Sequence, residues 1–146
     1  EIPKTSLPLA EDVYSVFRKL KDFDKVLYIG ISSGLSGTYN FIKLLGKEVF
    51  GDRFFSFDSK TLSGGQGLLV KKAAQMIEKG NTLADILVEL NIIRSRMFAE
   101  FIVKDITYLI QGGRIGKVAG TLGSLFKICP IIKVNDDGVY QTAGKS

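Results

Sequence analysis

Two patterns of apolar residues follow one another along the chain. From Ala10 to Leu20 the apolar residues recur at helical spacing, which predicts an amphipathic helix. Residues 25–31 are almost continuously apolar, which is typical of a strand buried on both faces of a sheet. The two patterns recur and predict further helices at residues 39–50, 67–79, 82–96, 106–111 and 116–126, and further strands at 53–57, 98–103, 131–134 and 139–142. Thr82, followed by Asp85 three residues later, resembles a capping box at the start of the helix at 82–96.

The order of these elements predicts two lobes. In residues 1–80 helices and strands alternate, as they do in an α/β fold with a parallel sheet. Residues 81–146 combine helices with a hairpin, because Asp137-Gly138 between two apolar runs favours a tight hairpin turn. We therefore expect an α/β protein whose first domain covers residues 1–80 and whose second, α+β domain covers residues 81–146.

Composition removes several classes of function. The 146 residues contain no histidine, which excludes a Ser-His-Asp triad, a Cys-His dyad and a histidine-ligated metal within this chain. Lys and Arg number 20 against 15 Asp and Glu, but they are scattered, so no nucleic-acid surface is indicated. No base stands beside a nucleophile in any motif. We therefore expect a binding protein and not an enzyme, with no metal and no cofactor.

Cysteine and hydropathy bear on the compartment. The single cysteine, Cys129, allows no disulfide within the chain, and a free thiol in an apolar stretch suits a reducing cytoplasm. No apolar run approaches the roughly 18 residues that a membrane-spanning helix needs. We therefore expect a cytoplasmic protein without stable membrane insertion.

The most informative segment is Ser32-Ser33-Gly34-Leu35-Ser36-Gly37-Thr38, here called the serine loop. It lies between a predicted buried strand and a predicted helix, and in open α/β sheets ligands bind at the carboxyl ends of strands. Glycines let the backbone come close, hydroxyls donate hydrogen bonds, and a helix N-terminus favours an anion. The serine loop therefore predicts a site for an anionic head group. The structural alternative is that Ser36 only caps the helix and the glycines only form a turn.

Three other segments have both a functional and a structural interpretation. Arg114 stands between glycines in Gly112–Lys117, where its guanidinium could bind a carboxylate or phosphate, or the glycines could simply end a helix. Thr5 and Ser6 precede the first helix and, on their own, indicate a cap and a turn. Asp58 ends a strand and is placed to orient a hydroxyl or a loop amide, or to cap the next turn.

Two further hypotheses compete with anion binding. Gly65–Val70 is close to the glycine-rich fingerprint of dinucleotide-binding folds, but Val70 replaces the third glycine, and no acidic residue ends a strand about 20 residues later. This segment would make the protein a nucleotide-dependent enzyme. The other hypothesis is a regulatory interaction domain without a small ligand.

Several stretches together resemble the DegV family. The order and spacing of these stretches fit over the whole chain. They are Lys4–Pro8, Ile31–Tyr39, Asp58–Lys60 with Gly67–Val70, Tyr108–Lys117 and Lys127–Ile132.

The resemblance implies a bacterial protein that holds one long-chain fatty acid, of the C16–C18 class, in a tunnel between two lobes. It also implies a partner, a fatty-acid kinase that phosphorylates the carboxylate of the bound acyl chain. The residues that it assigns to the carboxylate are Thr5 and the serines of the serine loop, with Ser33 and Ser36 favoured. Arg114 matches an arginine that faces either the head group or the kinase. The site residues expected for the fatty acid are Thr5, Ser6, Ser32, Ser33, Gly34, Ser36, Gly37 and Arg114.

The chain also departs from the family pattern. It is shorter than family members, so we expect it to be a central fragment without the N- and C-terminal parts. Leu7 stands where the family commonly has glutamine. From their positions near the serine loop and in the second lobe, the predicted tunnel walls are Ile29, Ile31, Leu109, Ile115, Leu122 and Leu125, for which ordinary core packing is the alternative.

Overall fold

The computed structural model describes residues 4–114 and 130–145. Its elements, in chain order, are α1 (Ala10–Lys19), β1 (Val26–Gly30), α2 (Thr38–Phe50), the 3-10 helix η1 (Gly51–Arg53), β2 (Phe54–Asp58), α3 (Ser63–Glu78), α4 (Leu83–Ser95), β3 (Glu100–Ile102), α5 (Thr107–Gln111), β4 (Pro130–Val134) and β5 (Tyr140–Lys145). The helix predicted at 116–126 lies outside the described residues.

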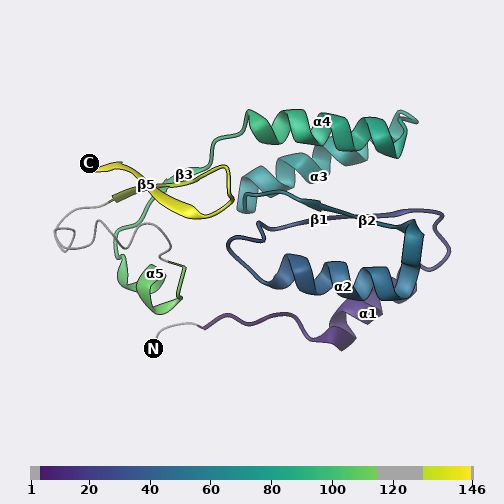
Figure 1. Cartoon of the computed structure of the whole chain (residues 1–146), viewed down its shortest axis with the longest axis horizontal. Coiled ribbons are helices and arrows are strands. Elements are labelled where there is room, and N and C mark those ends of the chain that lie inside the picture. Colours follow the sequence, from purple (N-terminus) through teal and green to yellow (C-terminus); the bar gives the residue numbers. More distant parts are fainter. Residues whose placement is uncertain (1–3, 115–129, 146) are drawn as a thin grey trace.

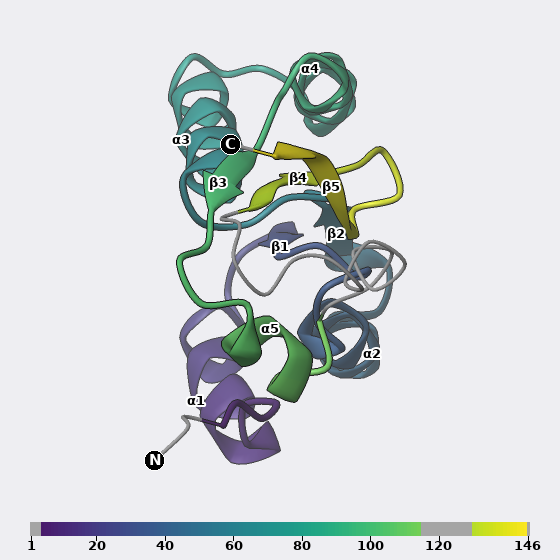
Figure 2. The ribbon, with the colours of Figure 1, turned by 90° about the vertical axis from the view of Figure 1, so that its left-hand side faces the viewer.

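The strands form two separate sheets. β1 and β2 pair in parallel, and β3, β4 and β5 form an antiparallel sheet in that order. The helices α3 and α4 cover one face of the parallel pair, and α1 and α2 cover the other (Figure 1). The three-stranded sheet lies beside the end of the parallel pair, as both views show (Figures 1 and 2). This arrangement confirms the predicted α/β class, with a parallel sheet followed by an α+β part.

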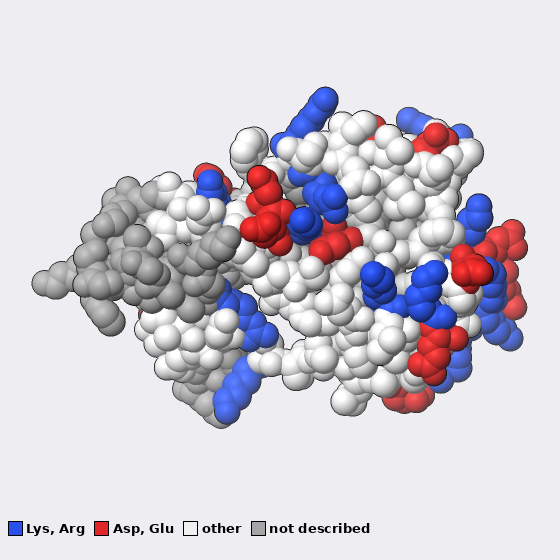
Figure 3. Space-filling model, in the orientation of Figure 1, with Lys and Arg blue, Asp and Glu red and all other residues white. Residues whose placement is uncertain are grey.

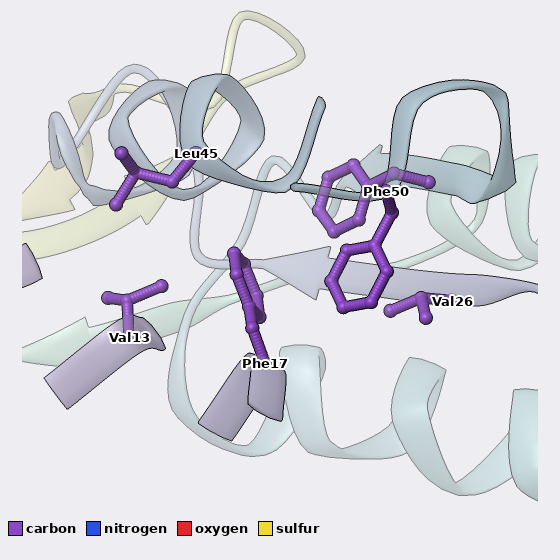
Figure 4. Close-up of a cluster of buried hydrophobic side chains, with 6 residues drawn as sticks. Val13, Phe17, Val26, Leu45 and Phe50 are labelled. Carbon is purple, nitrogen blue, oxygen red and sulfur yellow. The ribbon is translucent and has the colours of Figure 1, made fainter. Parts of the chain in front are cut away.

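One apolar cluster fills the face between the parallel strands and the helices α1 and α2 (Figure 4). The ring of Phe17 meets that of Phe50 edge to face, with centroids 5.2 Å apart, and the rings of Phe50 and Phe54 are stacked. The helical spacing of Val13 and Phe17 places both side chains on the buried face of α1. The cluster consists of Val13, Phe17, Val26, Leu45, Phe50 and Phe54.

A second cluster joins the opposite face of the sheet to α3 and α4. Leu69 of α3 and Leu90 of α4 are both fully buried beside Phe57 of β2. The helix α4 begins with the expected capping box, in which Thr82 and Asp85 exchange hydrogen bonds. Because α4 packs on α3, apolar contacts continue past residue 80. The domain boundary at that position stays a prediction.

Three of the described elements differ from the predicted ones by more than one residue, and one of them is β5, which runs to Lys145 instead of residue 142. The helix α3 begins at Ser63 instead of residue 67, so the glycines of this segment are helical. The strand β3 is shorter than predicted and covers only three residues. The hairpin β4–β5 turns at Asp136–Gly138, where Gly138 has a φ of 77°, a backbone conformation that favours glycine. No helix among the described residues is long and apolar enough to cross a membrane.

Candidate functional site

Parallel pairing brings two loops to one edge of the sheet. The serine loop follows β1, and residues 59–62 follow β2. The backbone N–H of Ser32 donates to the carbonyl of Thr61 at 2.9 Å, which ties the two loops together. Within the serine loop, the N–H groups of Leu35 and Ser36 both donate to the carbonyl of Ser32 at 3.1 Å. These backbone hydrogen bonds hold the serine loop in a defined conformation.

Ser32 connects the serine loop to the hairpin. Its side chain is fully buried, and its hydroxyl donates to the carbonyl of Gly138 at 2.6 Å. The same oxygen accepts a hydrogen bond from the N–H of Gly34 at 3.2 Å. Gly34 itself lies against Val139 and the Gly138 carbonyl, so a side chain there would meet the hairpin. In this structure, the hydroxyl of Ser32 therefore holds two segments of the protein together.

Ser33 is anchored by Asp58. Its hydroxyl donates to Oδ2 of Asp58 at 2.6 Å, and its backbone N–H donates to Oδ1 at 3.2 Å. Oδ1 also accepts from the N–H of Lys60 at 3.0 Å. Asp58 thus orients a hydroxyl and a loop amide and also caps the turn after β2, which confirms both interpretations of this residue.

Ser36 faces a cavity of about 910 Å³, here called the first cavity. Its hydroxyl donates to Oγ1 of Thr38 at 2.8 Å and accepts from the N–H of Thr38 at 3.2 Å. The first cavity brings five of the predicted site residues together, namely Thr5, Ser6, Ser36, Gly37 and Arg114. Its other described lining residues are Lys4, Leu7, Ile31, Leu35, Tyr108, Leu109, Gln111, Gly112 and Tyr140.

The first cavity therefore combines a polar part with an apolar part. Hydroxyls, a guanidinium and an ammonium line it together with four aliphatic side chains. It opens between the segment before α1, the serine loop and α5, and the space-filling view shows a gap between the part carrying α5 and the α/β layer (Figure 3). Such a combination suits an amphipathic ligand with an anionic end.

Arg114 follows the glycine pair that ends α5. The N–H of Gly112 donates to Tyr108 and that of Arg114 to Leu109, so the glycines end the helix as the structural alternative expected. The guanidinium nevertheless lines the first cavity and donates to the Gly112 carbonyl. Burial raises the pKa of Tyr140, and the nearby positive charge of Arg114 partly opposes that rise. Arg114 therefore acts electrostatically on the cavity wall.

Three of the predicted site residues, Ser32, Ser33 and Gly34, do not line the first cavity. Of the predicted tunnel walls, Ile31 and Leu109 line it, whereas Ile29 packs against the second apolar cluster. Ile115, Leu122 and Leu125 lie outside the described residues. The assignment of site residues stays a prediction.

The sequence interpretation missed two tyrosines of the first cavity. Tyr108 stands on α5, and Tyr140 begins β5. Tyr108 is part of the motif that contains Arg114, which is the one signal that could have indicated it. Tyr140 belongs to an ordinary strand pattern and carries no such signal.

The glycine-rich segment Gly65–Val70 does not form a phosphate-binding loop. It lies inside α3, where Gly65 packs closely against Thr61 and Met97. The side chain of Gln66 donates to the carbonyl of Ile29 at 3.1 Å. Gly65 therefore serves helix packing, Gly67 is helical with open space beside it, and the dinucleotide hypothesis loses its structural basis. Among the described residues, no group of three His, Cys, Asp or Glu could hold a metal ion.

Comparison with known proteins decides the family. A family model for uncharacterised proteins of the DegV family matches residues 1–146, which is the whole chain. The chain belongs to the DegV family. A DegV domain-containing protein of Clostridium acetobutylicum is 40% identical to this DegV chain over 148 residues. That match covers 100% of this chain and 53% of the relative.

Solved structures of DegV proteins confirm the fold class. A fatty-acid-binding DegV family protein from Thermus thermophilus is 35% identical, with a TM-score of 0.89, over 99% of this chain and 51% of that chain. A stearic-acid-binding protein from Eubacterium ventriosum is 31% identical, with a TM-score of 0.85, over 99% of this chain and 51% of that chain. The chain thus spans about half the length of the relatives it matches.

Proposed function

We propose that this DegV chain holds the carboxylate end of a long-chain fatty acid in the first cavity and acts as a carrier, not as an enzyme. The observation that carries the proposal is the composition of that cavity, in which Thr5, Ser6, Ser36 and Arg114 meet aliphatic side chains. The described fatty-acid-binding relatives support the same ligand class. Serine and threonine hydroxyls each supply one donor, and arginine supplies a planar fork that fits a carboxylate.

The remaining predicted residues take an indirect role in this proposal. The Ser32 hydroxyl donates its proton to the Gly138 carbonyl, and the Ser33 hydroxyl donates its proton to the Asp58 carboxylate. Gly34 allows the hairpin to approach the serine loop. These three residues shape the loop that presents Ser36 and Gly37 to the carboxylate. They therefore act as positioning residues.

The acyl chain supplies the larger part of the affinity in this proposal. Burying one methylene group contributes about 0.8 kcal/mol, whereas a hydrogen bond to a charged group contributes about 1.5–3 kcal/mol. We therefore expect affinity to rise with chain length up to the C16–C18 class, with the acyl chain extending from the first cavity into a tunnel between two lobes.

The resemblance to the family extends the proposal to a partner. An acyl carrier of this kind presents its carboxylate to a fatty-acid kinase in the cytoplasm, the compartment that the single Cys129 also favours. Arg114 supports such a role because it is exposed while lining the first cavity. Its guanidinium can therefore face a ligand or a docked protein.

Native mass spectrometry of the purified protein tests the proposal. We expect an added mass equal to one long-chain fatty acid, which is lost after extraction with organic solvent. Titration of the extracted protein with saturated fatty acids of increasing length should then give increasing affinity. A bound nucleotide would instead support the enzyme hypothesis. Failure to bind any fatty acid would favour an interaction domain without a small ligand.

A further inference from the structure

A second cavity, separate from the first, lies at the turn of the β4–β5 hairpin. Its volume is about 300 Å³, and none of its described lining residues is shared with the first cavity. It lies at the carboxyl end of β2, between the following loop, the end of α4 and the turn of the hairpin. The described residues that line it are Ser59, Lys60, Thr61, Arg94, Ser95, Met97, Ala99, Val134, Asn135 and Asp136.

Two cations line this second cavity without a carboxylate partner. Nζ of Lys60 donates to the backbone carbonyl of Asp136 at 3.0 Å. Arg94 donates to the carbonyl of Asp58 at 2.8 Å and to Oδ1 of Asn91 at 2.7 Å. In residues 4–114 and 130–145, neither cation forms an ion pair with Asp or Glu. An ammonium has three donors and a guanidinium has five, so both keep donors for a ligand.

Of the polar side chains beside these cations, Asn135 has a donor to spare, whereas the Thr61 hydroxyl is closed off from the cavity against Gly65. The Thr61 side chain is 4% exposed, and within the described part of the chain its hydroxyl has no hydrogen-bond partner. Oδ1 of Asn135 accepts from the N–H groups of Asp137 and Val139, each at 3.1 Å. The side-chain oxygen of Asn135 is therefore occupied, and its side-chain amide nitrogen, which is a hydrogen-bond donor, is left for a ligand. Leaving a buried hydroxyl without a partner is costly, which makes Thr61 notable.

The one carboxylate of the lining does not neutralise these donors. The side chain of Asp136 is exposed, whereas its carbonyl accepts from Lys60. The Arg94 guanidinium is held in place because it also lies over the ring of Phe57, 4.8 Å from its centroid. A fixed guanidinium beside an ammonium suits an oxyanion better than a cation or a neutral ligand.

The backbone at Lys60 gives a further observation. Its φ is 48°, in the left-handed region that residues with a side chain rarely adopt. The Asp58 carboxylate, which accepts from the Lys60 N–H, holds this conformation. Strained backbone of this kind is found preferentially at functional sites. Here it directs the lysine side chain toward the hairpin turn.

We propose that the second cavity binds a phosphate-sized oxyanion, which Lys60 and Arg94 hold from the α/β layer and Asn135 holds from the hairpin. The bound anion bridges the two parts of the structure. It adds to the existing links between them, the Ser32–Gly138 and Lys60–Asp136 hydrogen bonds. This site is distinct from the fatty-acid site, because it shares no described residue with the first cavity.

Calorimetric titration with inorganic phosphate, at constant ionic strength set by sodium chloride, tests this proposal. We expect saturable binding of one phosphate per chain and a phosphate-dependent rise in melting temperature. Lys60→Gln should weaken phosphate binding roughly tenfold. Lys60→Arg should restore it, because the charge and donors remain. Lys71→Gln is the matched control, since Lys71 is exposed on α3 and lines neither cavity.

A second variant separates binding from folding. Thr61→Val removes the unpartnered hydroxyl, which lies against Gly65 and not in the cavity, at nearly constant volume, so it should leave the melting temperature without phosphate unchanged or higher and should leave the affinity for phosphate unchanged. Equal responses to phosphate and chloride would overturn the proposal. So would a Lys60→Gln protein that binds phosphate like the Lys71→Gln control. Sulfate, tested in parallel, should compete with phosphate if the cavity recognises oxyanions by charge and shape.

Discussion

Ser36→Ala tests whether the serine loop holds a carboxylate directly. Ser36 has one hydroxyl proton, which it donates to Oγ1 of Thr38 at 2.8 Å in the structure. Binding a carboxylate therefore exchanges a neutral hydrogen bond, worth about 1 kcal/mol, for one to a charged group, worth about 1.5–3 kcal/mol. The net contribution is about 0.5–2 kcal/mol. The variant should accordingly bind a fatty acid roughly 2- to 30-fold more weakly.

The same substitution also has a structural cost. The oxygen of Ser36 accepts from the N–H of Thr38, the first residue of α2. Losing this bond should lower the free energy of unfolding by about 0.5–1 kcal/mol, as for the loss of a helix cap. Urea denaturation measures that cost separately from the affinity. The affinity is then measured on the folded protein by displacement of a fluorescent fatty acid.

Two further variants make the Ser36 experiment decisive. Ser15→Ala is the matched control, because it removes a hydroxyl on α1 that donates to the Asp12 carbonyl and does not line the first cavity. Thr38→Val removes the competing acceptor and should strengthen fatty-acid binding by freeing the Ser36 proton. If Ser36→Ala binds the fatty acid as tightly as the Ser15→Ala control does, the assignment of Ser36 to the carboxylate is refuted.

Three other predictions follow from single contacts. Arg114→Lys should weaken fatty-acid binding several-fold if the guanidinium holds the carboxylate as a fork. If Arg114 serves the kinase instead, fatty-acid binding should survive and phosphoryl transfer should fail. A variant that equals the unmodified protein in both assays leaves Arg114 with a structural role. Burial chiefly raises the pKa of Tyr28 to about 12. Its contribution to the free energy of unfolding is therefore complete below pH 10 and is lost as the pH rises from about 10 to 12. Urea titrations across this range should show that Tyr28→Phe loses about 1 kcal/mol less stability than the unmodified protein, a figure that allows for the partial exposure of Tyr28. Gly138→Ala should lower the melting temperature, because Gly138 has a φ of 77° and the added methyl group would overlap the Ser32 hydroxyl. It should also release the hairpin, which faster amide hydrogen exchange of Val139 would show.

Most of the fold could be predicted because it depends on local patterns. The helical spacing around Phe17 and the apolar run at residues 25–31 each need only neighbouring residues to be recognised. The Thr82–Asp85 capping box also lies within four residues and appears in the structure as expected. The start of α3 could not be predicted in this way. Its glycines favour a loop locally, whereas in the structure they are helical and Gly65 packs closely on Thr61.

The candidate site was predicted by residue type but not by role. The hydroxyls of Ser32, Ser33 and Ser36 look equivalent in a sequence, since they stand in one short loop. Their roles differ because their partners come from elsewhere, and the partner of Ser32 is Gly138, 106 residues away. No local pattern specifies a bond over that separation. The structure therefore separates one serine that lines the first cavity from two whose hydroxyls hold the loop in place behind it.

The β4–β5 hairpin is the element that relates the two cavities. Tyr140 on β5 lines the first cavity, whereas Asn135 and Asp136 in the turn line the second. Between them, Gly138 accepts the buried hydrogen bond from Ser32, next to the loop that presents Ser36. A displacement of the turn therefore changes the walls of both cavities, because one short segment supplies residues to each. An anion that holds the turn against the α/β layer would, by the same geometry, hold the serine loop in the conformation that faces the fatty acid. Coupling between the ligands is reciprocal, so each should strengthen the binding of the other by the same factor.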